Sequence, residues 1–255
     1  MLTGPEALLV ETANSLLRSL PPDDYHALQR HLRPVGFRSG HVLYEPEDQV
    51  DWVYFPESGL VSLISVMISG DQAESAVVGR EGGIGFLEAA GSGVIFSRAI
   101  VEIDLVAQRA PAAAYIATLD ASPSLRRTIA AHVELTIAEC RQTIACDAHH
   151  PAEARLAWLL LECQDRTGND HLDLTQEFLS VMLGVQRSTV SLVAAGLKAA
   201  GLITYSRGVI RVLDRAGLER KSCECYATNR RFRDLIEAGE LPLARGGRSA
   251  PGQPS

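Results

Sequence analysis

The stretch LTQEFLSVMLGVQRSTVSLVAAGLKAAGLI, Leu174–Ile203, is the most informative part of this chain. Thr175 can cap a helix that carries Glu177 in its first turn, where the helix dipole favours an acidic side chain. Gly184 follows at the end of that helix, and glycine readily adopts the left-handed backbone that a tight turn needs. The stretch therefore predicts a helix, a short turn and a second helix. The side chains expected on the buried face of the first helix are Phe178, Leu179, Met182 and Leu183.

The second helix is expected from about Arg187 to Ala200, with Gly201 in the position after a helix that glycine favours. Apolar residues recur along it at helical spacing and should point inward: Val190, Val193, Ala194 and Leu197. The opposite face of its first half is short and mostly polar, as in a helix that contacts base edges in the major groove. The residues on that outward face are Arg187, Ser188, Ser191, Leu192 and Ala195.

A predicted hairpin follows the second helix directly. Ile203–Tyr205 and Val209–Leu213 have strand-like composition, and Arg207-Gly208 forms the turn between them. A hairpin after a helix-turn-helix is a wing, and an arginine at its tip is placed to contact a phosphate. The alternative is a generic helical hairpin, because helix-turn-helix geometry also occurs in proteins that do not bind DNA. The residues that we expect at a double-stranded DNA are Thr175, Gln176, Gln186, Arg187, Ser188, Ser191, Leu192 and Arg207.

The charge of the chain is unevenly divided, although the formal net charge is −7. Residues 1–150 contain 10 Lys/Arg and 19 Asp/Glu, which gives −9, whereas residues 151–255 contain 14 and 12, which gives +2. Only the second part is therefore a candidate for phosphate contacts. Apolar runs are shorter than the ~18–20 residues that span a bilayer, and the first residues lack the cationic start of a signal peptide. We expect a cytoplasmic protein that does not associate with membranes.

The first half changes character along its length. Residues 7–32 have helical spacing around a Pro21-Pro22 break, whereas residues 35–106 contain short β-branched and aromatic runs separated by turn residues. Strands of this length and spacing predict a sandwich or a jelly-roll barrel.

A long helix is expected at Ser124–Cys146, which contains no Gly or Pro. At 1.5 Å per residue it would be about 33 Å long. Its narrow apolar stripe needs a partner, either the barrel of the same chain or an identical helix of a second chain. The stripe consists of Leu125, Ile129, Val133, Ile137, Cys140 and Ile144. His149-His150-Pro151 breaks this helix, and Ala152–Arg166 is predicted to form the next one.

With these features the sequence resembles the Crp/Fnr family of bacterial transcription regulators. The resemblance covers about residues 20–225 and rests on VYFPESGLVSLIS, VGREGGIG, the long helix and LTQEFLSVMLGVQRSTVS. It implies an α+β fold with an N-terminal double-stranded β-helix sensor (a jelly roll like a cyclic-nucleotide-binding domain), a dimerisation helix and a C-terminal winged helix-turn-helix. The corresponding boundaries are residues 1–122, 123–147 and 148–225, with a partly disordered C-terminal extension at residues 226–255 that becomes a flexible tail after about Leu243.

The resemblance also implies a function, which is regulation of transcription by a homodimer on palindromic operators. The first base-contacting arginine of the family falls on Arg187. The next contact, commonly Glu, falls on Ser188, and a further Arg falls on Leu192, so the operator should differ from that of the cyclic-AMP receptor protein. Arg187 could contact a guanine bidentately, and Leu192 could contact a thymine methyl. RNA polymerase is an expected partner if the protein is an activator.

The sensor departs further from the cyclic-AMP receptor pattern. Gly85 matches the glycine of the phosphate cassette, but Phe86 stands where a glutamate would hold the ribose hydroxyl. The Arg-Ser pair that meets the cyclic phosphate is reversed here, as Ser97-Arg98. On the long helix, Cys140 and Arg141 fall at the ligand-reaching positions. These six residues are the candidate effector pocket, and cyclic AMP is not the expected effector, whose identity and existence both stay open.

The cysteines and histidines limit other functions. Five cysteines are present, and only Cys223 and Cys225 are close in sequence, whereas a zinc site needs four ligands. We therefore expect neither a metal nor a cofactor, with metal or redox sensing by that pair as the alternative. A cupin-type metalloenzyme would need clustered histidines, and His41 is the one histidine in the barrel stretch. We expect no enzyme; an adaptor that binds protein through the winged helix is the remaining alternative.

Overall fold

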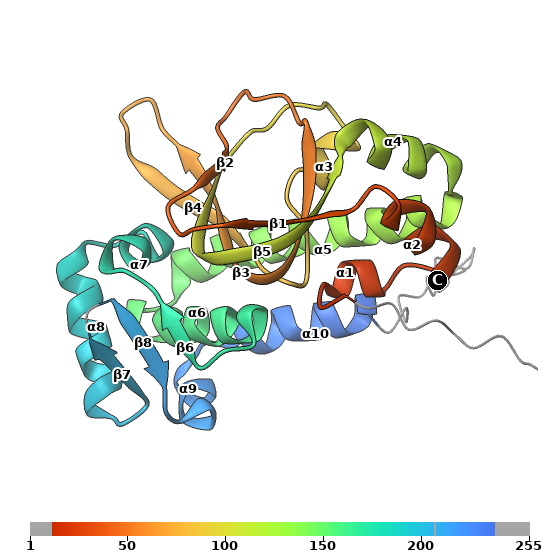
Figure 1. Cartoon of the computed structure of the whole chain (residues 1–255). Coiled ribbons are helices and arrows are strands. Elements are labelled where there is room, and N and C mark those ends of the chain that lie inside the picture. The colour runs from red at the N-terminus through yellow and green to blue at the C-terminus, as the bar shows by residue number, and fades with distance from the viewer. Residues whose placement is uncertain (1–11, 207, 238–255) are drawn as a thin grey trace, which may run out of the picture.

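The N-terminal part of the protein is an antiparallel barrel. The computed structural model describes residues 12–206 and 208–237, and within them five strands form one sheet in the order β1-β5-β3-β4, with β2 also paired to β5 (Figure 1). The register between β3 and β5 shifts at several points along their length. Such bulges bend strands, and the sheet accordingly curls over its own inner face. The strands are β1 (Arg33–Phe37), β2 (Val42–Tyr44), β3 (Trp52–Val66), β4 (Gln72–Val78) and β5 (Arg98–Pro111).

Short helices pack at one end of the barrel, and the first two of them flank the predicted proline break. They are α1 (Ser15–Arg18), α2 (Pro22–Gln29), α3 (Phe86–Ala89) and α4 (Ala112–Ala121). Asn14 caps α1 by accepting a hydrogen bond from the backbone N–H of Leu17 (2.9 Å). Leu16 and Leu17 then reach a core that also contains Phe55 and Tyr115. The predicted jelly-roll barrel is confirmed.

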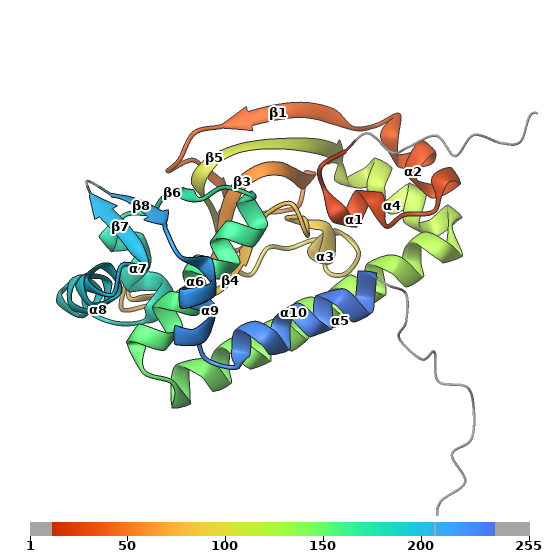
Figure 2. The same ribbon diagram turned by 90° about the horizontal axis from the view of Figure 1, so that it is seen from below.

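The predicted long helix is present as α5 (Pro123–His149), which runs under the barrel (Figure 2), but its apolar stripe is divided. Leu125 and Ile129 are buried in the core of their own chain. Further along, Ile137 is 44% exposed and Ile144 is 70% exposed. Of the two expected partners, the same chain therefore covers the first half of the stripe, where the short helices at the end of the barrel pack against it.

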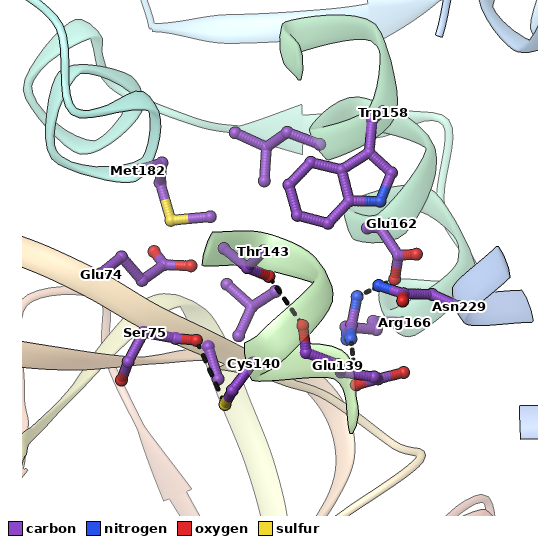
Figure 3. A pocket seen from close by; sticks show the side chains of 13 residues that line it. Glu74, Ser75, Glu139, Cys140, Thr143, Trp158, Glu162, Arg166, Met182 and Asn229 are labelled. Atoms are coloured by element: carbon purple, nitrogen blue, oxygen red, sulfur yellow. Dashed lines mark hydrogen bonds and ion pairs between the residues drawn. The ribbon is translucent and has the colours of Figure 1, made fainter. Parts of the chain in front are cut away.

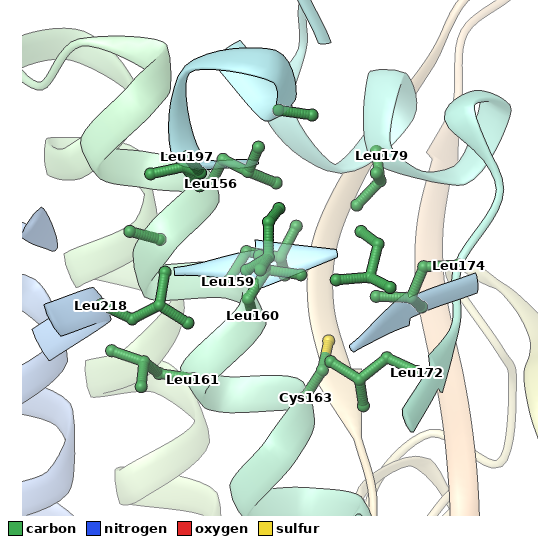
Figure 4. Packing of buried hydrophobic residues seen from close by; sticks show 14 of the residues in the cluster. Leu156, Leu159, Leu160, Leu161, Cys163, Leu172, Leu174, Leu179, Leu197 and Leu218 are labelled. Carbon is green, nitrogen blue, oxygen red and sulfur yellow. The ribbon is translucent and has the colours of Figure 1, made fainter. Parts of the chain in front are cut away.

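The C-terminal part is a helix-turn-helix with a three-stranded wing. The elements are α6 (Ala152–Thr167), β6 (His171–Asp173), α7 (Gln176–Leu183), α8 (Arg187–Ala199), β7 (Ile203–Ser206), β8 (Val209–Val212), α9 (Arg215–Lys221) and α10 (Cys225–Glu237). The two predicted wing strands are present, and β6 adds a third in the order β6-β8-β7. Figure 4 shows the core of this part, in which leucines of α6 meet Leu179 of α7 and Leu197 of α8.

No single described helix is both long and apolar enough to cross a membrane; α7 and α8 reach that composition only together, across a bend of 100°.

The barrel and the helix-turn-helix share one apolar core. Leu60 of β3 is fully buried among the leucines of α6, and Val77 and Ile103 pack against the same cluster. Beside it lies a buried ionic network centred on Arg166 of α6. Its guanidinium pairs with Glu81 of the barrel (2.8 Å), with Glu139 of α5 (3.3 Å) and with Glu162 of α6. Apolar and ionic contacts therefore both connect the two parts.

The helix α10 corrects the expected C-terminal extension. The sequence predicts no element after residue 225, whereas α10 lies along α5 (Figure 2). Its buried positions are Cys225, Tyr226 and Asn229, and Arg233 pairs with Glu162 at 2.6 Å. This face mixes apolar and polar side chains, yet the helix is amphipathic, so its helical periodicity was present in the sequence. The predicted flexible tail after Leu243 lies outside the described residues.

Candidate nucleic-acid interface

The two helices of the helix-turn-helix are positioned by the local features that the sequence predicts. The Thr175 hydroxyl accepts a hydrogen bond from the backbone N–H of Phe178 (3.1 Å) and so caps α7. Gly184 ends α7 with φ of 57°, a left-handed conformation that lets the chain turn at once into α8. The two helices are bent by 100° relative to each other, within the range of helix-turn-helix motifs.

The faces of α8 are divided as predicted. Val190, Ala194 and Leu197 are buried, and Val193 is partly buried. The first half of the opposite face is open to solvent, including Leu192, which is 73% exposed. The other exposed members of this face are Gln186, Arg187, Ser188, Ser191 and Ala195.

The guanidinium of Arg187 forms an ion pair with Glu177 of α7, which the sequence pattern does not predict. Both side chains are mostly exposed, so the pair is solvated and inexpensive to break. Gln186, the residue before α8, makes no side-chain capping bond, so the first N–H groups of the helix lack a side-chain acceptor from it. Such N–H groups favour anions. The beginning of α8 thus presents one cation and a helix N-terminus without a side-chain cap on the same exposed surface.

A groove separates the beginning of α7 from the wing. Thr175 and Gln176 line it from the helix side, and Tyr205, Ser206 and Gly208 line it from the wing. Gln176 is hydrogen-bonded to the Tyr205 hydroxyl, whose pKa is raised chiefly by burial. Tyr205 therefore belongs to this surface, although the sequence marked it only as a strand residue. Arg207, the predicted phosphate contact of the wing, lies outside the described residues.

The six candidate effector residues lie in different surroundings. Gly85 has φ of 76° and a side chain there would lie 2.9 Å from the Trp52 carbonyl oxygen, so this position needs glycine. Phe86 is only 4% exposed and belongs to the core beneath α1 and α4. Arg98 pairs with Glu45 (2.8 Å), and Ser97 beside it is half-buried. The two candidate residues on α5 are in other surroundings. The Cys140 thiol donates to the Ser75 carbonyl oxygen (3.5 Å), and Arg141 is exposed.

The cavity at Cys140 is small and acidic (Figure 3). It lies between β4, α5, α6, α7 and α10 and has a volume of about 30 Å³. A cavity needs a volume of roughly 10–15 Å³ to hold one water molecule. This one therefore accepts a water or two and is far too small for a nucleotide. Glu74 faces it from β4, and burial raises the pKa of this carboxyl well above its usual value.

A second carboxyl near Glu74 leads to a prediction about pH. Burial raises the pKa of Glu102 from 4.5 to about 7, and Ser62, which donates to Glu74 (3.1 Å), also bonds Glu102. The folded state therefore holds the Glu102 proton more tightly than the unfolded state, and its contribution to stability falls as pH rises from 4.5 through about 7. We expect Glu102→Gln to raise the free energy of unfolding at pH 8 by about 1–2 kcal/mol, discounted for partial exposure.

Urea unfolding of wild type and Glu102→Gln at pH 5 and pH 8 measures this difference. The two proteins should be similar at the lower pH and should separate at the higher pH. Other buried carboxyls titrate in both proteins, so only the difference between them reports on Glu102. An equal difference in free energy of unfolding between the two proteins at both pH values would contradict the prediction, because it would mean that ionisation of Glu102 does not destabilise the folded state.

The structure brings together four metal-ligand side chains, contrary to the expectation drawn from sequence spacing. The ligand atoms of Cys146, His150, Cys223 and Cys225 all lie within 4.8 Å of one another. The expectation rested on the one close cysteine pair. It was wrong about the number of ligands because Cys146 and Cys223 are 77 residues apart in the chain and meet only through the fold.

Comparisons with known proteins agree with this geometry. Residues 154–221 match the family model described as the Crp-like helix-turn-helix domain. No curated protein matches this sequence. Among solved structures, FixK2 from Bradyrhizobium japonicum has a TM-score of 0.66 and 16% identity, over 75% of this chain and 98% of that one.

Two further solved structures have the same fold. A CRP/FNR-family transcriptional regulator from Thermus thermophilus is 26% identical, with a TM-score of 0.59 over 74% of this chain and 98% of that one. CLP, the c-di-GMP responsive global regulator of Xanthomonas campestris, is 13% identical, with a TM-score of 0.61 over 75% of this chain and 99% of that one. The matches support a DNA-binding transcription regulator: residues 154–221 are a Crp-like helix-turn-helix domain, and the chain has the fold of Crp/Fnr family regulators.

Proposed function

We propose that the protein regulates transcription by binding palindromic operators as a homodimer, with the barrel as the place where a signal would act. The observation that carries the proposal is the exposed first half of α8, which projects from a helix-turn-helix bent by 100°. Recognition helices insert this end into the major groove. A regulator of this kind acts in the cytoplasm, where it contacts DNA and, as an activator, RNA polymerase.

The surface offers different chemistry for bases and for phosphates. Arg187 suits the two acceptors on the major-groove edge of guanine, and Leu192 suits a thymine methyl. Ser188 and Ser191 are short hydroxyl side chains beside them. The polar residues around this face are proposed as backbone contacts, which fix register without specifying sequence: Thr175, Gln176, Gln186 and Arg207.

The exposed part of α5 supports the dimer. Ile137 and Ile144 lie two helical turns apart on one face, and both remain open to solvent within the chain. A second copy presents the same two isoleucines, and a twofold pairing of α5 helices would cover them on both chains. Such a dimer places two α8 helices for the two half-sites of a palindrome.

The proposal is tested by selecting bound sites from random duplex DNA and measuring affinity for the selected site and a scrambled duplex over a range of salt. We expect a palindromic consensus. The logarithm of the binding constant should fall linearly with the logarithm of the salt concentration. Enrichment of no sequence, with affinity insensitive to salt, would instead favour a winged helix that binds protein.

We expect cyclic AMP not to bind in the barrel. The position at which the resemblance requires a ribose acceptor is Phe86, whose ring is buried in the core. Calorimetric titration with cyclic AMP should give no saturable heat, and the nucleotide should not change affinity for the selected DNA. A cyclic-AMP receptor protein titrated in the same buffer provides the positive control. Saturable micromolar binding that raises DNA affinity would contradict the prediction.

A further inference from the structure

We propose that Cys146, His150, Cys223 and Cys225 bind one Zn²⁺ ion that fastens α10 to the end of α5. Cys146 lies in the last turns of α5, and His150 is the residue that ends this helix. Cys223 precedes α10, and Cys225 is its first residue. The site therefore joins two helices that are distant in sequence, and it lies outside the DNA-binding surface and the cavity at Cys140.

The distances between the ligand atoms fit a tetrahedral ion. The sulfur atoms of Cys146 and Cys223 are 3.5 Å apart, and the Cys225 sulfur is 3.5 Å from Nδ1 of His150. Ligands bonded to tetrahedral zinc at its usual Zn–S and Zn–N distances are about 3.5–3.8 Å from one another. Since all four atoms lie within 4.8 Å of each other, only small side-chain adjustments are needed.

The surroundings of the ligands are those of a structural metal site. The three cysteines are buried against Trp158 and Ala154, where a thiolate needs a cation to offset its loss of hydration. The other ring nitrogen of His150, Nε2, lies 3.3 Å from a carboxylate oxygen of Glu224. Such a carboxylate orients a metal-bound histidine and raises its basicity. Gln142 donates from Nε2 to the Cys225 sulfur (3.0 Å), which further supports a thiolate.

The composition and the spacing favour a single zinc ion over other uses of these residues. Three sulfurs and one imidazole are a ligand set of closed structural zinc sites. An iron–sulfur cluster places several irons and sulfides between its cysteines, and these four atoms are too close together to enclose one. A disulfide would use two of the cysteines and would leave the His150 contact with Cys225 unexplained, and all five cysteines are free in the structure.

The site has a mechanical role in the fold. Beyond the ligands, α10 is held by Arg233, which reaches Glu162 (2.6 Å) and Glu139 (3.5 Å) in the buried network. The metal would fix the beginning of the helix where the ionic network fixes its later turns. Because the ligands must come together to bind the ion, metal affinity is coupled to the docking of α10.

The test is anaerobic titration of the reduced, metal-free full-length protein with Co²⁺, which reports tetrahedral thiolate sites in its absorption. We expect visible d–d bands and thiolate-to-cobalt charge transfer that saturate at one Co²⁺ per chain, and bleaching by one equivalent of Zn²⁺. Trypsin should cleave after Arg230 and Arg231 of α10 faster without metal than with it. No d–d bands, or trypsin rates indifferent to zinc, would overturn the proposal.

The variants separate a ligand role from a packing role. Cys223→Ser should weaken Co²⁺ binding by at least about 100-fold, and Glu224→Gln by about tenfold as an outer partner. Cys223→His keeps a ligand and should retain the d–d bands with weaker charge transfer, which a residue that merely packs would not do. Cys140→Ser removes a thiol outside the site and should bind as wild type. Binding by Cys223→Ser at wild-type strength, or a Cys146–Cys223 disulfide that forms in place of metal binding, would refute the site.

Discussion

Arg187→Ala is expected to lower affinity for the selected operator by about 1–3 kcal/mol, or roughly 5- to 150-fold, while affinity for scrambled DNA changes little. Arg187 stands at the end of α8 that the proposed function inserts into the major groove, and its guanidinium would match the two guanine acceptors. In the free protein this charge is already paired with Glu177, so it adds little to non-specific attraction. Anisotropy titrations on both duplexes at the same salt measure the two affinities, and selection with the variant should show relaxed preference at one base pair per half-site.

The ion pair supplies the matched control for this prediction. Removing Arg187 alone leaves the Glu177 carboxylate facing the DNA, so the double variant Arg187→Ala with Glu177→Gln keeps the net charge. It should show the same loss of discrimination. Arg207→Ala should instead weaken binding to both duplexes alike and lower the salt slope by about one unit. Equal losses on operator and scrambled DNA for Arg187→Ala would make it a phosphate contact, with Gln186 and Ser191 as the next candidates for base contact.

Ile137→Asp combined with Ile144→Asp is expected to convert the protein to monomers. Both side chains are exposed in the single chain, so their replacement should leave the fold intact and act only where a second chain covers them. Burying a carboxylate in that seam costs roughly several kcal/mol for each chain. Sedimentation equilibrium over a range of concentrations measures the association constant, and circular dichroism checks the fold.

An exposed isoleucine away from α5 serves as the control for the dimer. Ile116 on α4 is 38% exposed, and Ile116→Asp should remain dimeric. The monomeric variant should also lose most of its affinity for a palindrome while it retains weak binding to a half-site. A dimer of unchanged strength in the α5 variant would place the interface on another surface.

Local signals predicted the part of the fold that local chemistry determines. The Thr175 cap, the Gly184 turn and the inward spacing from Val190 to Leu197 are each set by neighbours within a few residues, and all three are present. The barrel and the long α5 were predicted for the same reason, from strand composition and from a run without Gly or Pro. The exposed face of α8 followed from periodicity alone.

The remainder depends on contacts between residues far apart in the chain. The sequence does not reveal the ion pair between Arg187 and Glu177. Glu177 is already explained by its place in the first turn of a helix, and Arg187 by its place at the beginning of the next one. Arg233 of α10 forms its ion pairs only because the fold brings carboxylates of α5 and α6 beside it. Phe86 and Cys140 were grouped by resemblance, whereas the packing of this chain places the first in the core and the second at a separate small cavity.

The burial of Leu60 among the leucines of α6 also restricts how this protein can be recombined. Val77 and Ile103 belong to the same cluster, and Arg166 pairs with Glu81 of the barrel. Each half therefore has apolar and charged side chains at the boundary that are buried only by contact with the other half. A chimaera that joins this barrel to the helix-turn-helix of a relative would bring together two incomplete surfaces, one of them with an unmatched charge. New operator preferences are therefore more accessible through point changes on the exposed face of α8 than through exchange of whole domains.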